Sequence, residues 1–535
     1  MPSKKMSKKA KDKQLEREKT FLHMIARGII LMTLVVFPLF IGSSKYVSLS
    51  WEKALFFWIL ALASGIVFLL FYTVYFSDGG RPKENILRSL SPVDWAVLAY
   101  FLIATLSNIL SPHPDVVWLG MTERYDGWFT TAGVVLIYFI ISRWYKPKLT
   151  DAVFFAASSI LVCLIGVLQF FSMDIFNLFP YERFPQYTSL TIFFRTTLGN
   201  VNVLSAYTCM TIVLFGVLYA KSQGRLRFLF LFASVFNFWL LHIAGAGADA
   251  GKVSVLGVMV VLIPCWIAQR ETFGRILFLS SLWGFVFMLY NWILLYRPLS
   301  AWGDVPADLV SPIPVLYVFI LSVAGVMLSA LLIFFKPSIW LPEKNAFRIG
   351  CMVLLVMIAG LLGIIEIAGA NLPAENPVFQ AREVLHGNIQ DDFGSNRGFV
   401  WRKSIEASFN QPILGTGSDT FYYALGKETQ SEAVERYGVI FDKAHNDFLQ
   451  NLLCHGLPGL LAYLSILIGL IVKAFKKIAK DGFLLAIMAA VGAYMIQGFF
   501  GVNTTIVMPI FWVFLAMAAG HLYQSEPVAI QRTVS

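Results

Sequence analysis

The sequence predicts an all-α, polytopic integral membrane protein. Of its 535 residues, 57% are hydrophobic and only 14% are charged, and the mean hydropathy of +0.69 is well above that of a soluble domain. Apolar runs long enough to cross a hydrocarbon core of about 30 Å recur along the chain. We therefore predict about 14 (12 to 14) transmembrane helices, together with one large polar loop. The runs lie near residues 22–42, 54–76, 93–110, 128–145, 151–171, 198–220, 226–246, 251–269, 275–296, 313–335, 347–369, 448–472, 483–500 and 503–522.

The distribution of lysine and arginine predicts the topology. The first twenty residues contain eight of these basic residues and no small-residue cleavage site follows, which indicates a retained basic tail and not a signal peptide. With this tail inside, the cytoplasmic segments hold 27 basic residues and the outer loops hold seven, the long loop left aside. We expect both termini to be cytoplasmic. The net charge of +10 suits an anionic leaflet of the lipid bilayer better than nucleic acid.

One membrane domain with one insertion follows from this topology. The predicted parts are a basic cytoplasmic tail (1–20), transmembrane helices 1 to 11 (21–369), an extracytoplasmic loop with an amphipathic helix (370–447), transmembrane helices 12 to 14 (448–523) and a cytoplasmic tail (524–535). Within the loop, Asn396 is expected to cap a helix that begins at Arg397 and carries Trp401 along the membrane surface. The five cysteines are widely spaced in apolar runs, so neither a disulfide framework nor a metal site is predicted.

Short polar motifs gather in and around this loop. They are R-x-x-x-W (Arg397, Trp401), P-x-L-G-x-G (Pro412, Leu414, Gly415, Gly417), H-N-D-F-L-Q (from His445 to Gln450) and G-L-P-G-L (from Gly456 to Leu460). Two earlier pieces are G-x-x-x-R-Y-D-G (Gly120, Arg124, Gly127) and G-N-V-N (Gly199, Asn200, Asn202), the latter followed by Ala206. Together these motifs resemble the signature region of the O-antigen ligase and polymerase superfamily, over roughly residues 115–470.

This resemblance implies a membrane glycosyltransferase similar in architecture to the GT-C type. Such enzymes transfer a glycan from a polyprenyl diphosphate, for example undecaprenyl diphosphate, to an acceptor hydroxyl on the outer face of the cell membrane. The implied role is in the synthesis of polysaccharides of the cell envelope, with no cofactor and no metal ion. The acceptor is left open: another glycan for a polymerase, a lipid or cell-wall polymer for a ligase, or a protein hydroxyl for an oligosaccharyltransferase.

The chemistry requires cations for the leaving diphosphate, since negative charge develops there as the sugar bond breaks. Candidates at the outer ends of the runs and in the loop are Arg397, Lys252 and Arg195. Where the family often has S-R-G-A, this chain has Gly251 to Ser254 with Lys252 in place of the arginine, so the planar fork that grips phosphate is lost there. Arg195 and Lys252 could instead anchor span ends.

The predicted acceptor-activating group is His445, which joins the loop directly to an apolar run. A base with a pKa near neutrality assists attack by a hydroxyl, and the neighbouring Asn446 and Asp447 could orient the imidazole. The alternative is a histidine that only caps a helix at the interface. Asn200, Asn202 and Trp401 are further candidates for contact with substrate or support of the site. The paired Asp391 and Asp392 are more typical of a solvated loop than of a metal site.

Two other classes of protein remain compatible with the sequence. A flippase for lipid-linked oligosaccharides would also have many spans, although it needs charges along a central cavity. A structural partner of an envelope complex could retain the fold without the activity, and the replacement at Lys252 keeps that possibility open.

Overall fold

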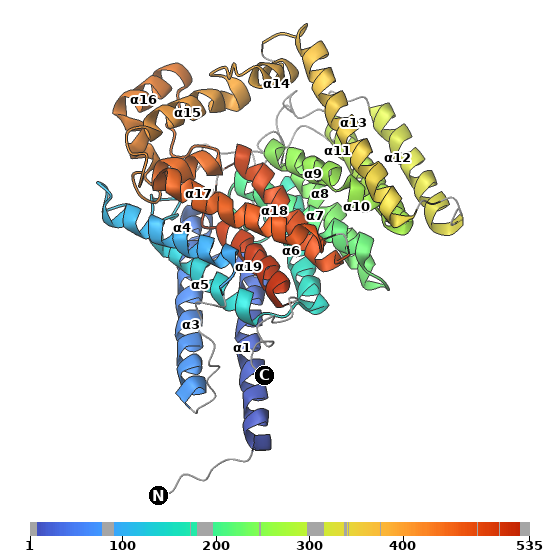
Figure 1. The fold of residues 1–535 in the computed structure, drawn as a ribbon. Helices are drawn as coiled ribbons and strands as arrows, with labels where there is room; N and C mark the ends of the chain where they lie inside the picture. The colour runs from blue at the N-terminus through green and yellow to red at the C-terminus, as the bar shows by residue number, and fades with distance from the viewer. Residues whose placement is uncertain are drawn as a thin grey trace, which may run out of the picture.

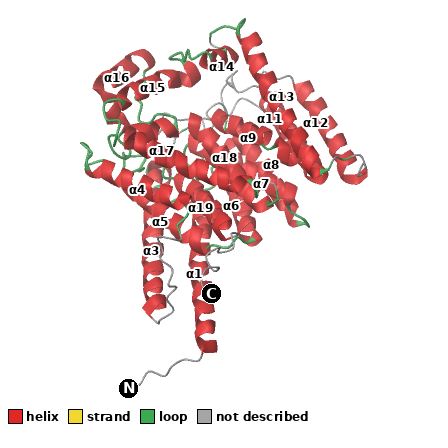
Figure 2. Ribbon diagram, in the orientation of Figure 1, coloured by secondary structure: helices red, strands yellow, loops and turns green. Residues whose placement is uncertain are grey.

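The computed structural model describes residues 8–77, 90–171, 173–178, 196–244, 248–296, 315–335, 340, 342–374, 376–478, 480–501 and 503–524. Every regular element in these ranges is a helix (Figure 2), so the predicted all-α class is confirmed. The helices are α1 (Lys8–Leu31), α2 (Phe37–Leu39), α3 (Leu49–Ser77), α4 (Pro92–Ile109), α5 (Trp128–Trp144), α6 (Leu149–Phe170), α7 (Val201–Lys221), α8 (Leu226–Ile243), α9 (Asp249–Val261), α10 (Ile263–Ile267), α11 (Arg270–Tyr296), α12 (Val315–Ala330), α13 (Glu343–Gly369), α14 (Pro377–Leu385), α15 (Phe393–Ser408), α16 (Phe421–Tyr437), α17 (Asp447–Phe475), α18 (Gly482–Phe500) and α19 (Met508–Gln524).

The protein is a multi-pass membrane protein. Among the described residues, eleven helices are long and apolar enough to span a bilayer, and α5 and α19 are shorter apolar helices. The predicted run at 251–269 is different, because it divides into α9 and the five-residue α10 with Leu262 between them. Pro264 explains the division, since proline cannot donate the backbone hydrogen bond that a continuous helix needs.

The centre of the bundle is α7, whose residues from Val203 to Ala220 are all buried. It packs against α8, α9 and α18, while α19 packs on α5 and α17 packs on α4. In Figure 1, α14, α15 and α16 lie together at one end of this bundle, and the N-terminal end of α1 lies at the opposite end. We call the first of these the α14–α16 end.

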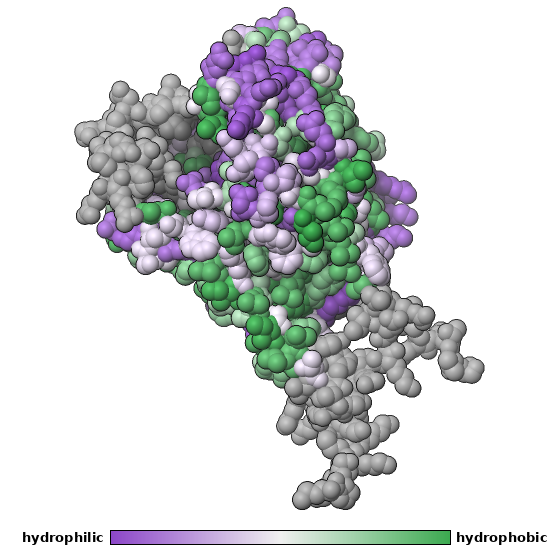
Figure 3. Space-filling view, turned by 90° about the vertical axis from the view of Figure 1, so that its left-hand side faces the viewer, coloured by the Kyte–Doolittle hydropathy of each residue, from purple (hydrophilic) through white to green (hydrophobic). Residues whose placement is uncertain are grey.

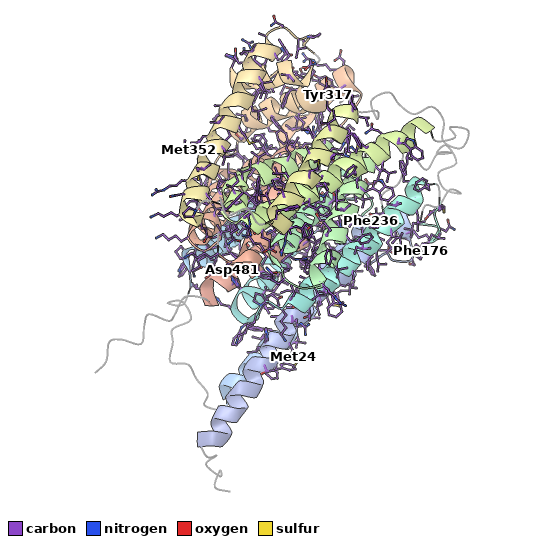
Figure 4. The ribbon with its side chains drawn as sticks, turned by 90° about the vertical axis from the view of Figure 1, so that its right-hand side faces the viewer. Met24, Phe176, Phe236, Tyr317, Met352 and Asp481 are labelled. Atoms are coloured by element: carbon purple, nitrogen blue, oxygen red, sulfur yellow. The ribbon has the colours of Figure 1, made fainter. Side chains whose placement is uncertain are left out.

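The outer surface of the bundle is apolar. Large hydrophobic side chains are exposed along α3, α12 and α13, and Figure 4 marks exposed examples at Met24, Tyr317 and Met352. In Figure 3, polar residues gather toward the α14–α16 end, at the top of the view, and hydrophobic residues lie below them. An apolar surface of this extent suits contact with lipid, because all backbone polar groups of the helices are satisfied internally.

The polar loop contains three helices, where the sequence predicted one amphipathic helix. The element α15 begins at Phe393, and Gly394, Ser395 and Asn396 have φ values of 58°, 61° and 68°. Asn396 therefore lies in a left-handed turn, and the prediction that it caps the helix at Arg397 is wrong. The helices α15 and α16 share a small core that includes Phe399, Val400, Phe421, Ala433 and Phe441. This core holds Arg397 and Trp401 over the end of the bundle.

Candidate active site

A break in α17 organises the site. Gly456 has φ 69° and ψ −177°, so the helix is interrupted between the segments that precede and follow it. A continuous helix would bond the Leu457 N–H to Leu453 and leave the Cys454 carbonyl without a donor, because residue 458 is proline. At the break, the Leu453 and Cys454 carbonyls and the Leu457 N–H have no hydrogen-bond partner within α17 and must find one elsewhere.

The P-x-L-G-x-G segment, residues 412–417, supplies those partners, and we call it the docking segment. The Thr416 N–H donates to the Leu453 carbonyl at 3.0 Å and the Gly417 N–H donates to the Cys454 carbonyl at 2.9 Å, while the Leu457 N–H donates to the Pro412 carbonyl at 2.7 Å. Gly415 is required because a Cβ there would lie 2.4 Å from the Leu453 carbonyl oxygen. The P-x-L-G-x-G segment and the start of the G-L-P-G-L motif therefore lie against each other through their backbones.

His445 stands immediately before the N-terminus of α17. Its φ of 49° lies in the left-handed region, which is uncommon for a residue other than glycine. The next residue, Asn446, caps the helix, because its Oδ1 accepts from the N–H groups of Phe448 and Leu449 at 2.9 and 3.1 Å. Asn446 thus has a structural role that fixes where the helix starts and where the imidazole is placed.

A buried ion cluster holds the segment that carries His445. The Lys443 Nζ lies 2.6 Å from Asp419 Oδ1 and 3.1 Å from Asp126 Oδ2, and the Lys443 side chain is buried. Burial alone would lower the pKa of Lys443, but the carboxylates of Asp419 and Asp126 together hold it above its usual value. Burial raises the pKa of Asp126 to about 6, against the opposing charge of Lys443. These contacts join three distant parts of the chain.

The second ion pair at this segment joins Arg124 and Asp442, with Nε 2.6 Å from Oδ2. Burial favours the neutral acid, but the Arg124 guanidinium holds the pKa of Asp442 below its usual value. Arg124 lies in a loop closed by Gly120 and Gly127, where a Cβ on Gly127 would meet the Gly120 nitrogen at 2.5 Å. The R-Y-D piece of that loop therefore supplies two of the three ion-pair partners of the His445 segment, Arg124 and Asp126, and Asp419 is the third.

The structure places Arg397 close to His445. Burial lowers the pKa of His445 to about 4, and the positive charge of Arg397 contributes in the same direction while Asp442 opposes it. The Arg397 Nη1 donates to the Gly394 carbonyl at 2.7 Å, which ties the guanidinium to the left-handed turn. The Arg397 Nε and the His445 Nδ1 are both buried without a hydrogen-bond partner in the protein. Two predicted site residues therefore each carry a buried nitrogen without a hydrogen-bond partner in the protein.

Trp401 and Asp447 both contact α18. The Trp401 ring packs on Phe499 and Phe500 at the end of α18, with centroid distances of 5.4 and 6.1 Å. Asp447 is buried, and the Tyr494 hydroxyl donates to its Oδ2 at 3.3 Å. Trp401 thus attaches the polar loop to α18, and Asp447 attaches the start of α17 to α18.

The remaining predicted residues are placed differently. Lys252 lies on α9 and its Nζ is 2.9 Å from Asp249 Oδ1, while the Asp249 charge raises the pKa of Arg397 against the lowering by burial. Lys252 is therefore on the side of the site toward Arg397. Asn200 caps α7 by accepting from the Asn202 N–H at 2.8 Å, which gives it a structural role. Arg195 lies outside the described residues.

Sequence reasoning missed Lys443, Asp126 and Asp419 as components of the site. Opposite charges within one short motif, at Arg124 and Asp126, were the available signal. Among the described residues no group of three or more His, Cys, Asp or Glu side chains is arranged to hold a metal ion. Glu366, near the end of α13, pairs with Arg382 of α14 and with His386, the residue that follows α14. Asp391 pairs with Arg402 and Arg436.

Comparison with known families finds a similarity over part of the chain. Residues 309–464 match the family model described as O-antigen ligase. This part of the chain is similar to that family. The match runs from just before α12 into α17, and so includes Arg397, Trp401 and His445. Lys252 and the two earlier motifs lie outside it. No curated protein matches the chain.

This similarity supports a membrane glycan-transfer function in O-antigen or cell-envelope synthesis. The matched part includes the docking segment, the break in α17 and the His445 segment, which the structure connects through backbone hydrogen bonds and the Lys443–Asp419 ion pair.

Proposed function

We propose that the protein transfers a glycan from a polyprenyl-diphosphate carrier to an acceptor hydroxyl at the outer face of the cell membrane. The observation that carries this proposal is that Arg397 and His445 each have a buried nitrogen without a hydrogen-bond partner in the protein, and that the charge of Arg397 acts on the His445 imidazole. Such atoms are costly unless a ligand or water completes their hydrogen bonds. A glycosyl diphosphate and an acceptor hydroxyl are ligands of the required kind.

In this reaction Arg397 is assigned to the diphosphate. A guanidinium offers several donors in a fixed plane and keeps its charge when partly buried. Charge that develops on the departing diphosphate is stabilised most strongly where water is excluded. Lys252 and Asp249 lie toward the same side, so Lys252 would add a second, less directional positive charge.

His445 is assigned to the acceptor hydroxyl. With its pKa lowered to about 4, the imidazole is neutral at physiological pH and can accept a proton. Part of that lowering comes from Arg397, so a bound diphosphate that neutralises Arg397 would raise the pKa of His445 toward the range of an effective general base. Donor binding would then prepare the base for attack by the acceptor.

The orientation in the membrane belongs to the same proposal. The basic residues predict that the loop 370–447 is extracytoplasmic and both termini are cytoplasmic. This assignment is supported by the position of the N-terminal end of α1 at the opposite end of the bundle from α14, α15 and α16 (Figure 1). The site would then face the pool of lipid-linked glycan at the outer surface.

A reconstituted transfer assay with the cell's own lipid-linked glycan and acceptor fraction tests the proposal. His445→Ala should lower turnover by about 10²–10⁴-fold while donor binding stays near normal, and Arg397→Lys should lose most donor binding as well as turnover. Arg402→Lys is the matched control, because Arg402 lies on the same helix but pairs with Asp391 at the surface. Transfer at the wild-type rate by His445→Ala would exclude its role in catalysis, and full activity of Arg397→Ala would exclude the diphosphate assignment.

A further inference from the structure

A cavity lies at the loop that holds Arg124, the partner of Asp442 in the His445 segment. Its volume is about 340 Å³, and it is lined by residues 46–51, residues 122–125, the start of α7 with Gly199 and Asn200, and the loop before α19 with Thr504 and Ile506. This volume falls in the range of small-molecule sites. Neither Arg397 nor His445 lines it, so it is distinct from the region assigned to the diphosphate.

The lining combines aromatic rings with hydroxyl and amide groups. Trp51 and Tyr125 both line the cavity, with ring centroids 5.2 Å apart and planes inclined by 54°, and the Trp51 side chain is 37% exposed. Ser48, Ser50 and Thr122 add hydroxyls to the lining. Aromatic faces next to hydrogen-bonding groups suit ligands that have both apolar C–H faces and hydroxyls. A pyranose ring has this character.

The charge of the lining argues against a diphosphate in this cavity. Among the described residues of the lining, the cation is Arg124, which already pairs with Asp442 at 2.6 Å. The carboxylate of Glu123 also lines the wall. An anionic ligand would have to compete with Asp442 for Arg124. A neutral, hydroxyl-rich ligand meets no such conflict.

The cavity is joined to the His445 segment through short chain connections. Arg124 lines the cavity and binds Asp442, three residues before His445, and Asp126 follows Tyr125 and binds Lys443. On another wall, Thr504 follows Asn503, which lines a narrow crevice together with His445 and Asp447. The charge of Arg124 also acts on His445, so a ligand in the cavity would lie on the Arg124 side of the base.

The wall formed by Glu123 and Tyr125 is held in an uncommon backbone conformation. Their φ values are 73° and 52°, a region that costs free energy for residues other than glycine. The Tyr125 carbonyl accepts hydrogen bonds from the hydroxyls of Thr130 and Thr505, which fixes the residue from behind. The ring of Tyr125 is thus presented to the cavity by a rigid support.

We propose that this cavity binds a sugar ring of the acceptor glycan and presents its hydroxyl to His445. The inference rests on the proposed glycan transfer and adds to it that the acceptor is itself a carbohydrate and not a protein hydroxyl. The diphosphate of the donor lies on the Arg397 side of His445, and the acceptor sugar lies on the Arg124 side. Trp51 is in this view a binding residue that determines acceptor affinity.

Binding is tested with the full-length protein in lipid nanodiscs. The probe is the glycan mixture released by mild acid from the lipid-linked glycans and the envelope polysaccharide of the source cell, detected by saturation-transfer NMR. Wild type and the control Trp95→Ala, an exposed tryptophan on α4 away from the cavity, should show sugar signals. Trp51→Ala and the cavity-filling Ser50→Trp should lose them, whereas His445→Ala should retain them.

The transfer assay separates this inference from the proposed function. Trp51→Ala should raise the KM for acceptor by roughly tenfold with kcat and the KM for donor little changed, since the variant loses one aromatic contact with the bound sugar. The inference is overturned if wild type gives no sugar signal or if Trp51→Ala raises only the KM for donor. It is also overturned if wild type and Trp51→Ala transfer the glycan equally well to a protein hydroxyl. Persistent sugar binding in a protein that shows no glycan transfer would instead reject the proposed function alone.

Discussion

Replacing Gly456 with alanine tests whether the break in α17 and the docking segment form one unit. An alanine Cβ would lie 2.3 Å from the Ile413 carbonyl oxygen and 2.4 Å from its carbon, which are backbone atoms that cannot rotate away. The segment would have to move, and the three hydrogen bonds that attach it to α17 would be lost. At about 0.5–1.5 kcal/mol each, these bonds represent roughly 1.5–4.5 kcal/mol. The backbone strain of alanine at φ 69° adds about 1–3 kcal/mol.

Gly426→Ala is the matched control for this prediction. Gly426 has φ 76° and ψ 160°, close to the conformation of Gly456, but a Cβ there would meet no atom within 4 Å. The control therefore measures the backbone strain alone. Apparent Tm in detergent should fall more for Gly456→Ala than for Gly426→Ala, and hydrogen exchange should accelerate at the Thr416 and Gly417 amides only in the former. Equal effects of the two substitutions would refute the argument.

Three further predictions concern charge and topology. Lys252→Arg should be tolerated or increase transfer, since arginine restores the planar fork; a loss of transfer would place Lys252 outside the diphosphate site. Arg397→Met should raise the pKa of His445 from about 4, because removing a neighbouring positive charge favours the imidazolium, and an unchanged NMR titration of His445 would show that the two are not coupled. A cysteine at Ser431 should be labelled from outside intact cells while one at Lys480 is protected; the reverse pattern would contradict the proposed orientation.

The hydropathy of the sequence was sufficient to predict the class of fold and most of its helices. In a bilayer each span must satisfy its own backbone, so a long apolar run has few alternatives to a helix. The prediction was wrong at 251–269, where Pro264 divides the run, and for the loop, where three helices replace one. The left-handed turn at Gly394 to Asn396 was also missed, because a polar sequence there suggested an ordinary helix start.

The candidate site could be predicted only in part. His445 and Arg397 were found through short motifs, and the family match includes both. The ion cluster was not found, because Lys443 lies more than 300 residues from Asp126 in the sequence and their proximity depends on the packing of the whole bundle. Asn446 and Asn200 were identified by type, but the structure shows that each caps a helix.

The connection between the break in α17 and His445 runs through Asp419. Backbone hydrogen bonds fix Thr416 and Gly417 on the broken helix, and two residues later Asp419 receives the Met121 N–H and pairs with Lys443. Lys443 in turn lies two residues before His445. A shift of the docking segment would therefore move a buried carboxylate away from its lysine, and a buried pair that loses one partner is strongly destabilised. These contacts give a physical reason why Gly415 and Gly456, which lie away from the proposed reacting atoms, occur with His445 in the part of the chain that matches the family model.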